Sequence, residues 1–254
     1  MSDVKEMATG RYIYCVTRTP AVENLNIGGI DGLPVSMVSV NGLAVVCSPS
    51  EVKRYRLSRR DTLAHELVIE RAMEFGTVLP VRFGTVAESE ALIRKKLLSQ
   101  RNDDLHELLE KMDGKVEMGV KVLFDADLVY AHIVEHDDTI RKLRDQLADR
   151  PANETHYERI KLGQMVEQAL SQRKIDDADW IMEQLQPYAV DSRRNDVYSE
   201  LMVLNASFLV ETAREPALEQ AVHEIDVAFK GVTIIKYVGP LPPFNFVDLV
   251  ISWR

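Results

Sequence analysis

The sequence predicts an α+β protein with two domains. Two sets of short strands, rich in β-branched and aromatic residues, are each combined with segments of helical periodicity. A polar turn at Asp113-Gly114 separates the two sets. The length of 254 residues is also long for a single hydrophobic core and comfortable for two. We therefore expect an N-terminal α+β domain at residues 1–113 and a second domain from residue 114.

The N-terminal domain is expected to contain three strands, a helix, a further strand and more helices. Strands are predicted at 11–17, 35–40, 42–47 and 77–80, and Pro49 is expected to end the third. Asn41-Gly42 lies between two apolar runs, which predicts a type I′ hairpin turn. Residues 59–75 predict a helix that buries Ala64, Leu67, Val68, Ala72 and Phe75, and residues 87–112 predict helix broken near 99–102.

The second domain, residues 114–238, begins with strict alternation of apolar and polar residues. Val116, Met118, Val120, Val122 and Phe124 define a buried face, while Lys115, Glu117, Gly119 and Lys121 point outward. A helical insertion follows at 127–186, with an antiparallel hairpin over 137–186 that turns near Pro151. Its second helix carries the stripe Leu162, Met165, Val166, Ala169 and Leu170.

The rest of this domain completes a β-α-β-β-α-β order. A short strand is expected at 188–191, a polar turn at 192–196 and a strand at 201–210. Thr212 and Glu215 form a plausible capping box for the next helix, and a last strand covers 232–238. This order is that of the ferredoxin-like split βαβ arrangement, here with an enlarged first helical connection.

The C-terminal tail, residues 239–254, combines prolines with apolar side chains. Pro240, Pro242 and Pro243 hold its first part extended. Seven apolar residues follow: Phe244, Phe246, Val247, Leu249, Val250, Ile251 and Trp253. Because so much apolar surface is unfavourable in water, we expect the tail to dock on the N-terminal domain; an additional strand of the C-terminal sheet is the alternative.

The amino-acid composition and the charge limit the classes of protein to which the chain can belong. Hydrophobic residues make up 46% and charged residues 28%, values typical of a globular protein. No apolar run approaches the roughly 18 residues that span a bilayer, and the first residues do not form a signal peptide, so we expect a cytoplasmic protein. The net charge of −9, with Lys and Arg interspersed with acids, argues against nucleic-acid and membrane partners. Cys15 and Cys47 are expected to be buried apolar residues.

Several polar residues have a spacing that makes them candidate site residues. Asp61, His65 and Glu70 share the helix at 59–75, but their spacing does not form HExxH, so we interpret them as a polar helix face. Arg82 is expected to anchor its loop to a carboxylate. His132 and His136 are spaced i, i+4 without an evident third ligand, and are interpreted as surface histidines.

No catalytic, cofactor-binding or metal site is predicted. The glycine-rich loop at 26–32 matches neither GxGxxG nor a P-loop and leads into a strand, whereas a phosphate cradle opens a helix. Its glycines are expected to serve backbone turns. We therefore expect no enzyme activity and no cofactor.

Three ordered motifs carry a family resemblance. They are Val78-Leu79-Pro80-Val81-Arg82-Phe83-Gly84-Thr85, the alternating strand Gly114 to Val122, and Gly239-Pro240-Leu241-Pro242-Pro243-Phe244. Together with the strand around Tyr12 and residues 205–210, they resemble the gas vesicle protein F/L family, more closely the F type. Leu241 departs from the family pattern, in which an aromatic residue is more usual at this place.

The resemblance implies a function in assembly. Members of the family take part in building a gas-filled protein shell, so it implies a cytoplasmic accessory or minor structural protein associated with the gas vesicle, which confers buoyancy. The implied partners are the small hydrophobic shell subunit and other gas vesicle accessory proteins. It also implies an N-terminal α+β domain followed by a modified ferredoxin-like domain.

Two other functions stay open at this point. A ferredoxin-like protein can bind or convert a small molecule, since that fold hosts many functions. RNA binding on a ferredoxin-like sheet would need exposed aromatic residues on the central strands, where this chain offers Lys115, Glu117 and Lys121.

Overall fold

The computed structural model describes residues 9–19, 25–151 and 153–253, and it confirms the α+β class. Contacts between residues divide the chain into two units. The first unit contains the residues up to Glu117 and those from Pro240 onwards, and the second unit is Met118–Gly239. The predicted boundary at Asp113-Gly114 lies in the turn just before the strand that enters the second unit, where Gly114 has a φ of 65°.

The first sheet is antiparallel and has the strand order β2-β3-β1-β4, with β5 paired to β1. The strands are β1 (Thr9–Arg18), β2 (Ser36–Val40), β3 (Leu43–Glu51), β4 (Val78–Pro80) and β5 (Val86–Ala87). Five consecutive residues of β1, from Tyr12 to Val16, are completely buried. Because successive side chains of a strand point to opposite faces, both faces of β1 are covered.

The hairpin between β2 and β3 confirms the turn prediction. Asn41 and Gly42 have φ values of 50° and 82°, as a type I′ turn requires at both central positions. The prediction that Pro49 ends β3 was wrong, since the strand continues to Glu51. The pairing of β3 with β2 stops at Cys47, so the missing N–H of Pro49 interrupts no hydrogen bond on that side.

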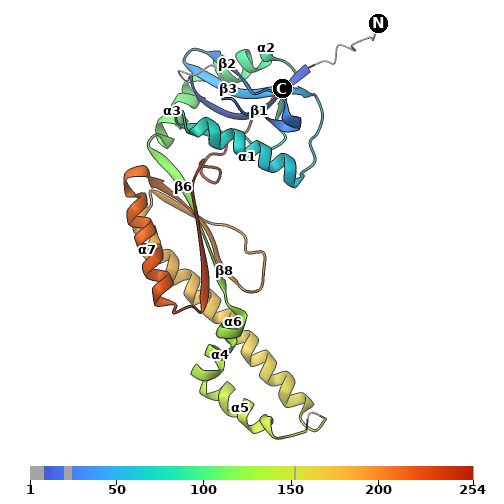
Figure 1. Ribbon diagram of the computed structural model, residues 1–254, viewed down its shortest axis with the longest axis vertical. Helices are drawn as coiled ribbons and strands as arrows, with labels where there is room; N and C mark the ends of the chain where they lie inside the picture. The colour runs from blue at the N-terminus through green and yellow to red at the C-terminus, as the bar shows by residue number, and fades with distance from the viewer. Residues whose placement is uncertain (1–8, 20–24, 152, 254) are drawn as a thin grey trace. The chain divides into compact units, whose positions relative to one another are not determined.

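The described residues of the first unit also form five helical segments: the 3₁₀-helix η1 (Ile30–Gly32), α1 (Arg59–Met73), α2 (Glu90–Leu92), the π-helix η2 (Ile93–Ser99) and α3 (Asn102–Met112). Helix α1 runs along the sheet and contacts β1 and β4 (Figure 1). The break predicted near 99–102 is confirmed between η2 and α3. The π-helix was not predicted, because Ile93, Leu97 and Leu98 follow the same apolar spacing as an α-helix.

The second sheet has the strand order β7-β8-β6-β9, formed by β6 (Lys115–Phe124), β7 (Asp191–Arg194), β8 (Met202–Glu211) and β9 (Thr233–Leu241). The first and third strands in sequence are therefore central, which is the order of the ferredoxin-like split βαβ fold. Helices α6 (His156–Leu185) and α7 (Glu215–Ala228) pack against each other, and α6 also packs on β8 (Figure 1).

Three local predictions in this unit were wrong. Residues 192–194 were expected in a turn but belong to β7, because backbone pairing with β8 outweighs their polar side chains. Thr212 and Glu215 form no capping box, since a 3₁₀ turn at Thr212–Arg214 precedes α7. Glu117 was expected to point into water but is only 2% exposed.

The helical insertion contains α4 (Ala126–His136), α5 (Asp138–Ala148) and α6. The 30 residues of α6 span about 45 Å at 1.5 Å per residue. Helix α5 ends before Pro151 and α6 begins after it. The two helices contact each other, which confirms the predicted hairpin. Arg159 of α6 closes the turn by donating hydrogen bonds to the carbonyl oxygens of Leu147 and Arg150.

We predict that Leu170→Asp destabilises the protein by about 3 kcal/mol, because it places an unpaired carboxylate where the native side chain is 8% exposed. Gln168→Asp adds the same charge at an exposed position of the same helix and should change stability little. Urea denaturation of the two variants measures the difference, and equal midpoints would show that Leu170 is not part of the core.

Candidate functional site

Tyr12 and His65 form a buried polar network at the centre of the first unit. The Tyr12 hydroxyl lies 3.1 Å from His65 Nδ1, and His65 Nε2 lies 3.0 Å from the Val81 carbonyl oxygen. Since a carbonyl oxygen only accepts, Nε2 carries the proton and Tyr12 donates to Nδ1. The Tyr12 oxygen in turn accepts a hydrogen bond from the Gly84 amide at 2.9 Å. The network therefore joins β1, α1 and the loop after β4.

Burial keeps the His65 ring neutral. The side chain is 4% exposed, and desolvation lowers its pKa to about 4. The interpretation of His65 as part of a polar helix face was wrong. The buried residues of helix α1 are His65, Val68, Ile69 and Ala72, whereas Leu67 is 44% exposed. The buried face is therefore rotated about the helix axis relative to the predicted one.

Asp61 and Glu70 do not join His65. Asp61 lies at the start of α1, where it contacts Ser58 and Arg60, and the hydrogen bond from Ser58 lowers its pKa most. Glu70 instead affects the carboxyl group of Glu66. Burial of that group raises its pKa most, and the negative charge of Glu70 raises it further. The three residues therefore form no common site.

The C-terminal tail packs on the first unit. Phe244 contacts the core cluster that contains Tyr12, Tyr14 and Val68, and Leu249 is 2% exposed. Glu117 accepts two hydrogen bonds from Asn245, from the backbone amide at 2.8 Å and from Nδ2 at 2.5 Å. These contacts explain why Glu117 is buried: the tail covers it and supplies its donors.

Arg82 pairs with Asp248 of the tail at 2.8 Å, which confirms that it binds a carboxylate. Both side chains are exposed, so the pair contributes little to stability. Arg101 adds a hydrogen bond to the carbonyl oxygen of Val250 at 2.8 Å. Sequence reasoning missed Asn245 and Asp248, because nothing in the tail marks them as partners of residues more than 120 positions earlier.

The glycine-rich loop serves packing and turns. A Cβ on Gly29 would lie 2.1 Å from the Tyr14 hydroxyl oxygen, and the neighbouring Ile30 amide donates a hydrogen bond to that oxygen at 2.8 Å. Gly32 has a φ of 71°, a conformation that glycine adopts without strain. The expected role in backbone turns is confirmed.

His132 and His136 stack on one face of α4, with ring centroids 3.8 Å apart. Arg173 of α6 donates to His132 Nδ1 at 2.6 Å and also contacts Asp177 and the ring of Phe124. The pKa of His132 is lowered mainly by burial of its ring and, next, by the positive charge of Arg173. The pair therefore links α4 to α6. Within the described ranges, no three His, Cys, Asp or Glu residues are grouped as metal ligands would be.

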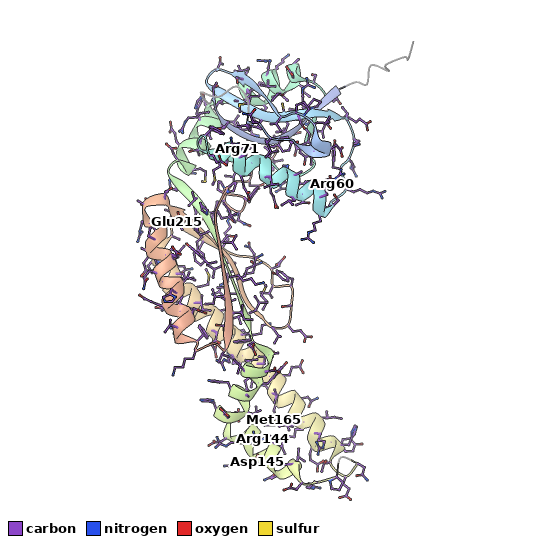
Figure 2. The ribbon with its side chains drawn as sticks, in the orientation of Figure 1. Arg60, Arg71, Arg144, Asp145, Met165 and Glu215 are labelled. Atoms are coloured by element: carbon purple, nitrogen blue, oxygen red, sulfur yellow. The ribbon has the colours of Figure 1, made fainter. Side chains whose placement is uncertain are left out.

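A groove of about 710 Å³ lies along α6. Its lining combines apolar residues with a charged margin: Tyr130, Arg159, Leu162, Gly163, Val166, Glu167, Leu170, Ser171, Lys174 and Glu200. Part of the stripe predicted on this helix, Leu162 and Val166, is thus only half-buried and accessible. Tyr157, Ile160 and Ile175 of the same helix are 84%, 46% and 56% exposed. Figure 2 labels Met165, another residue of this stripe.

None of the helices in the described part of the chain combines the length and apolar character needed to cross a membrane. The exposed apolar side chains of α6 form an arrangement that suits contact with another protein. A groove with an apolar floor and charges at its margin fits an amphipathic helix.

Residues 10–248 match the family model for the gas vesicle synthesis proteins GvpL/GvpF. The chain belongs to this family. Gas vesicle protein F of Microcystis aeruginosa is 29% identical over 96% of this chain and 100% of the relative. Gas vesicle protein F of a Streptomyces species is 32% identical over 93% of this chain, and gas vesicle protein L1 of Halobacterium salinarum 26% identical over 96%.

Solved structures agree with this assignment. The crystal structure of GvpF from Anabaena superposes with a TM-score of 0.79 at 28% identity and covers 96% of this chain and 100% of that one. GvpF from Microcystis aeruginosa gives a TM-score of 0.72 at 29% identity. These comparisons favour the F type and show an α+β gas vesicle protein.

We predict that His65 makes the protein less stable in acid. Its pKa is about 4 when folded and 6.5 in the unfolded chain, so between these values only the unfolded state takes up a proton. Stability is unaffected above pH 6.5 and falls as the pH drops towards 4. From pH 7 to pH 5 this contribution amounts to about 2 kcal/mol.

Urea denaturation at pH 7 and pH 5 tests the contribution of His65. The variant His65→Gln should lose about 2 kcal/mol of this pH dependence, whereas His156→Gln, at an exposed histidine, should keep it. The same pH dependence in both variants would contradict the neutral, buried state of His65.

Proposed function

We propose that this gas vesicle protein acts in assembly of the shell or as a minor structural component, in the cytoplasm and without an enzymatic step. The observation that carries the proposal is the extent of the similarity. The match to gas vesicle protein F covers 96% of this chain and the whole of the relative, so it includes both units and the start of the tail.

The partners in this proposal are the hydrophobic shell subunit and other gas vesicle accessory proteins. A gas-filled shell needs an apolar inner surface, and its subunits must be kept from aggregating before they assemble. The groove along α6 supplies a surface for this purpose, since Leu162, Val166 and Leu170 form an apolar floor between Arg159 and Lys174. A helix of the shell subunit would lie in it with its apolar face down.

The domain division is part of the same proposal. Residues 1–113 would form the N-terminal domain, and residues 114–238 the ferredoxin-like domain with its helical insertion at 127–186. Residues 239–254 would be a tail that docks on the N-terminal domain. The contacts of Phe244, Asn245 and Asp248 with the first unit support the last part.

We predict that Val166→Glu weakens binding of the shell subunit about tenfold or more, because it places a carboxylate in the apolar floor of the groove. The matched control is Gln168→Glu, which adds the same charge on an exposed part of α6 outside the groove. Pull-down of the shell subunit at equal protein concentration measures the effect, and thermal denaturation shows that both variants are folded.

Two possible negative results distinguish an error about the binding groove from an error about the proposed function. Equal capture by both variants would exclude the groove as the binding surface but leave association with the shell subunit intact. Failure of the unmodified protein to capture the shell subunit, and its absence from purified vesicles, would contradict the proposed function itself.

A further inference from the structure

Residues 53–60 form a strongly basic segment in an acidic protein. Five of these eight residues are cations, namely Lys53, Arg54, Arg56, Arg59 and Arg60, and none is an acid. The net charge of the whole chain is −9. The expectation that Lys and Arg are interspersed with acids is therefore wrong at this place, where positive charge is concentrated.

The fold presents this basic segment to solvent. It runs from just after β3 into the first turn of α1, and Tyr55 anchors it. The Tyr55 ring packs edge-on against Tyr12 at 5.0 Å, and its hydroxyl lies 2.8 Å from Ser50 Oγ. With Tyr55 directed inward, the neighbouring Arg54 and Arg56 are exposed.

Only part of the charge is neutralised. Lys53 pairs with Glu51, and Arg60 pairs with Asp31 and Asp61. For Arg54, Arg56 and Arg59, no ion pair is formed with any residue that the structure describes. Two apolar side chains accompany them: Leu57 is 79% exposed, and Val52, directly before the segment, is 52% exposed.

The positive charges of Arg59 and Arg60 lie where they destabilise α1. They occupy its first two positions, where the helix dipole favours acids and disfavours cations. Figure 2 labels Arg60 at this end of the helix. Arg60 gains ion pairs with Asp31 and Asp61 there, whereas Arg59 gains none with a described residue. Local conflicts of this kind are expected at functional positions. Arg59 is thus better explained by a partner than by the fold.

We propose that the basic segment, with Leu57 at its centre, is the binding site for an acidic segment of a partner protein that carries apolar residues between its carboxylates. Carboxylates would pair with Arg54, Arg56 and Arg59, whose guanidinium groups bind them in a bidentate manner. The exposed Leu57 supplies the apolar contact.

Two other polyanions fit less well. Eight extended residues reach at most about 29 Å, and beyond this length a nucleic-acid strand would meet a surface of overall negative charge. Binding to an anionic membrane usually relies on an amphipathic helix with several apolar anchors. Here the segment is irregular until α1 begins, and Tyr55 is turned into the core.

Fluorescence polarisation with the full chain tests this site. The probe is a fluorescein-labelled peptide, Glu-Glu-Leu-Asp-Glu-Leu-Asp-Glu, and the matched peptide carries Gln and Asn in place of the acids. We expect saturable binding of the acidic peptide only. The triple variant Arg54→Gln/Arg56→Gln/Arg59→Gln should weaken it about tenfold or more, by loss of three exposed ion pairs.

The control variant Lys95→Gln/Lys142→Gln/Lys161→Gln removes the same charge from exposed lysines elsewhere and should bind nearly as the unmodified protein does. Absence of binding, equal binding of both peptides, or equal weakening in both triple variants would overturn the proposal. Tighter binding of a 20-nucleotide single strand or of phosphatidylglycerol vesicles would overturn the choice of an acidic protein segment.

The single variant Arg59→Glu separates binding from folding. It should abolish much of the peptide binding and at the same time raise the melting temperature, since an acid in the first turn suits the helix dipole. A lower melting temperature together with weaker binding would show that Arg59 serves the fold, which contradicts the proposal.

Discussion

The carboxylate of Glu117 accepts hydrogen bonds from the backbone amide and the side chain of Asn245, although the two residues lie 128 positions apart. Glu117 is the last residue of the first unit before β6 continues into the second, and Asn245 follows shortly after the chain returns at Pro240. A buried carboxylate is stable only when its oxygens have donors. The first unit therefore depends on the segment that returns to it after β9.

The tail also completes the core that Tyr12 organises. Phe244 packs on the cluster containing Tyr12 and Tyr14, while Arg82, in the loop that Tyr12 holds through Gly84, pairs with Asp248. Tyr55, which anchors the basic segment, packs on the same Tyr12 ring. One tyrosine thus links the α1 helix, the tail and the segment that we assign to partner binding.

Much of the fold could be predicted from the sequence, because local patterns determine it. The alternation in β6, the Asn41-Gly42 turn and the break at Pro151 each predict the element that the structure contains. Predictions failed where tertiary contacts outweigh local pattern. Ser192 to Arg194 pair with β8 despite polar side chains, and His65 is buried because Tyr12 and Val81 satisfy both ring nitrogens.

The candidate surfaces were harder to predict than the fold. The stripe on α6 has the spacing of a core helix, and only the structure shows that Leu162 and Val166 also line an accessible groove. The basic segment is visible in the sequence itself, but the net charge of −9 conceals it in any whole-chain average. Its exposure depends on Tyr55, which packs inward on Tyr12 while the neighbouring Arg54 and Arg56 remain exposed.

The dependence of the first unit on its tail can be measured directly by amide hydrogen exchange with mass spectrometry. The amides of Phe244, Asn245, Phe246 and Val247 are all hydrogen-bonded, so residues 243–250 should exchange slowly in the unmodified protein. In Glu117→Ala, exchange should accelerate in this segment and around Tyr12, while peptides from α6 keep their rates. Complete exchange of residues 243–250 within seconds in the unmodified protein, or an unchanged pattern in the variant, would contradict the account.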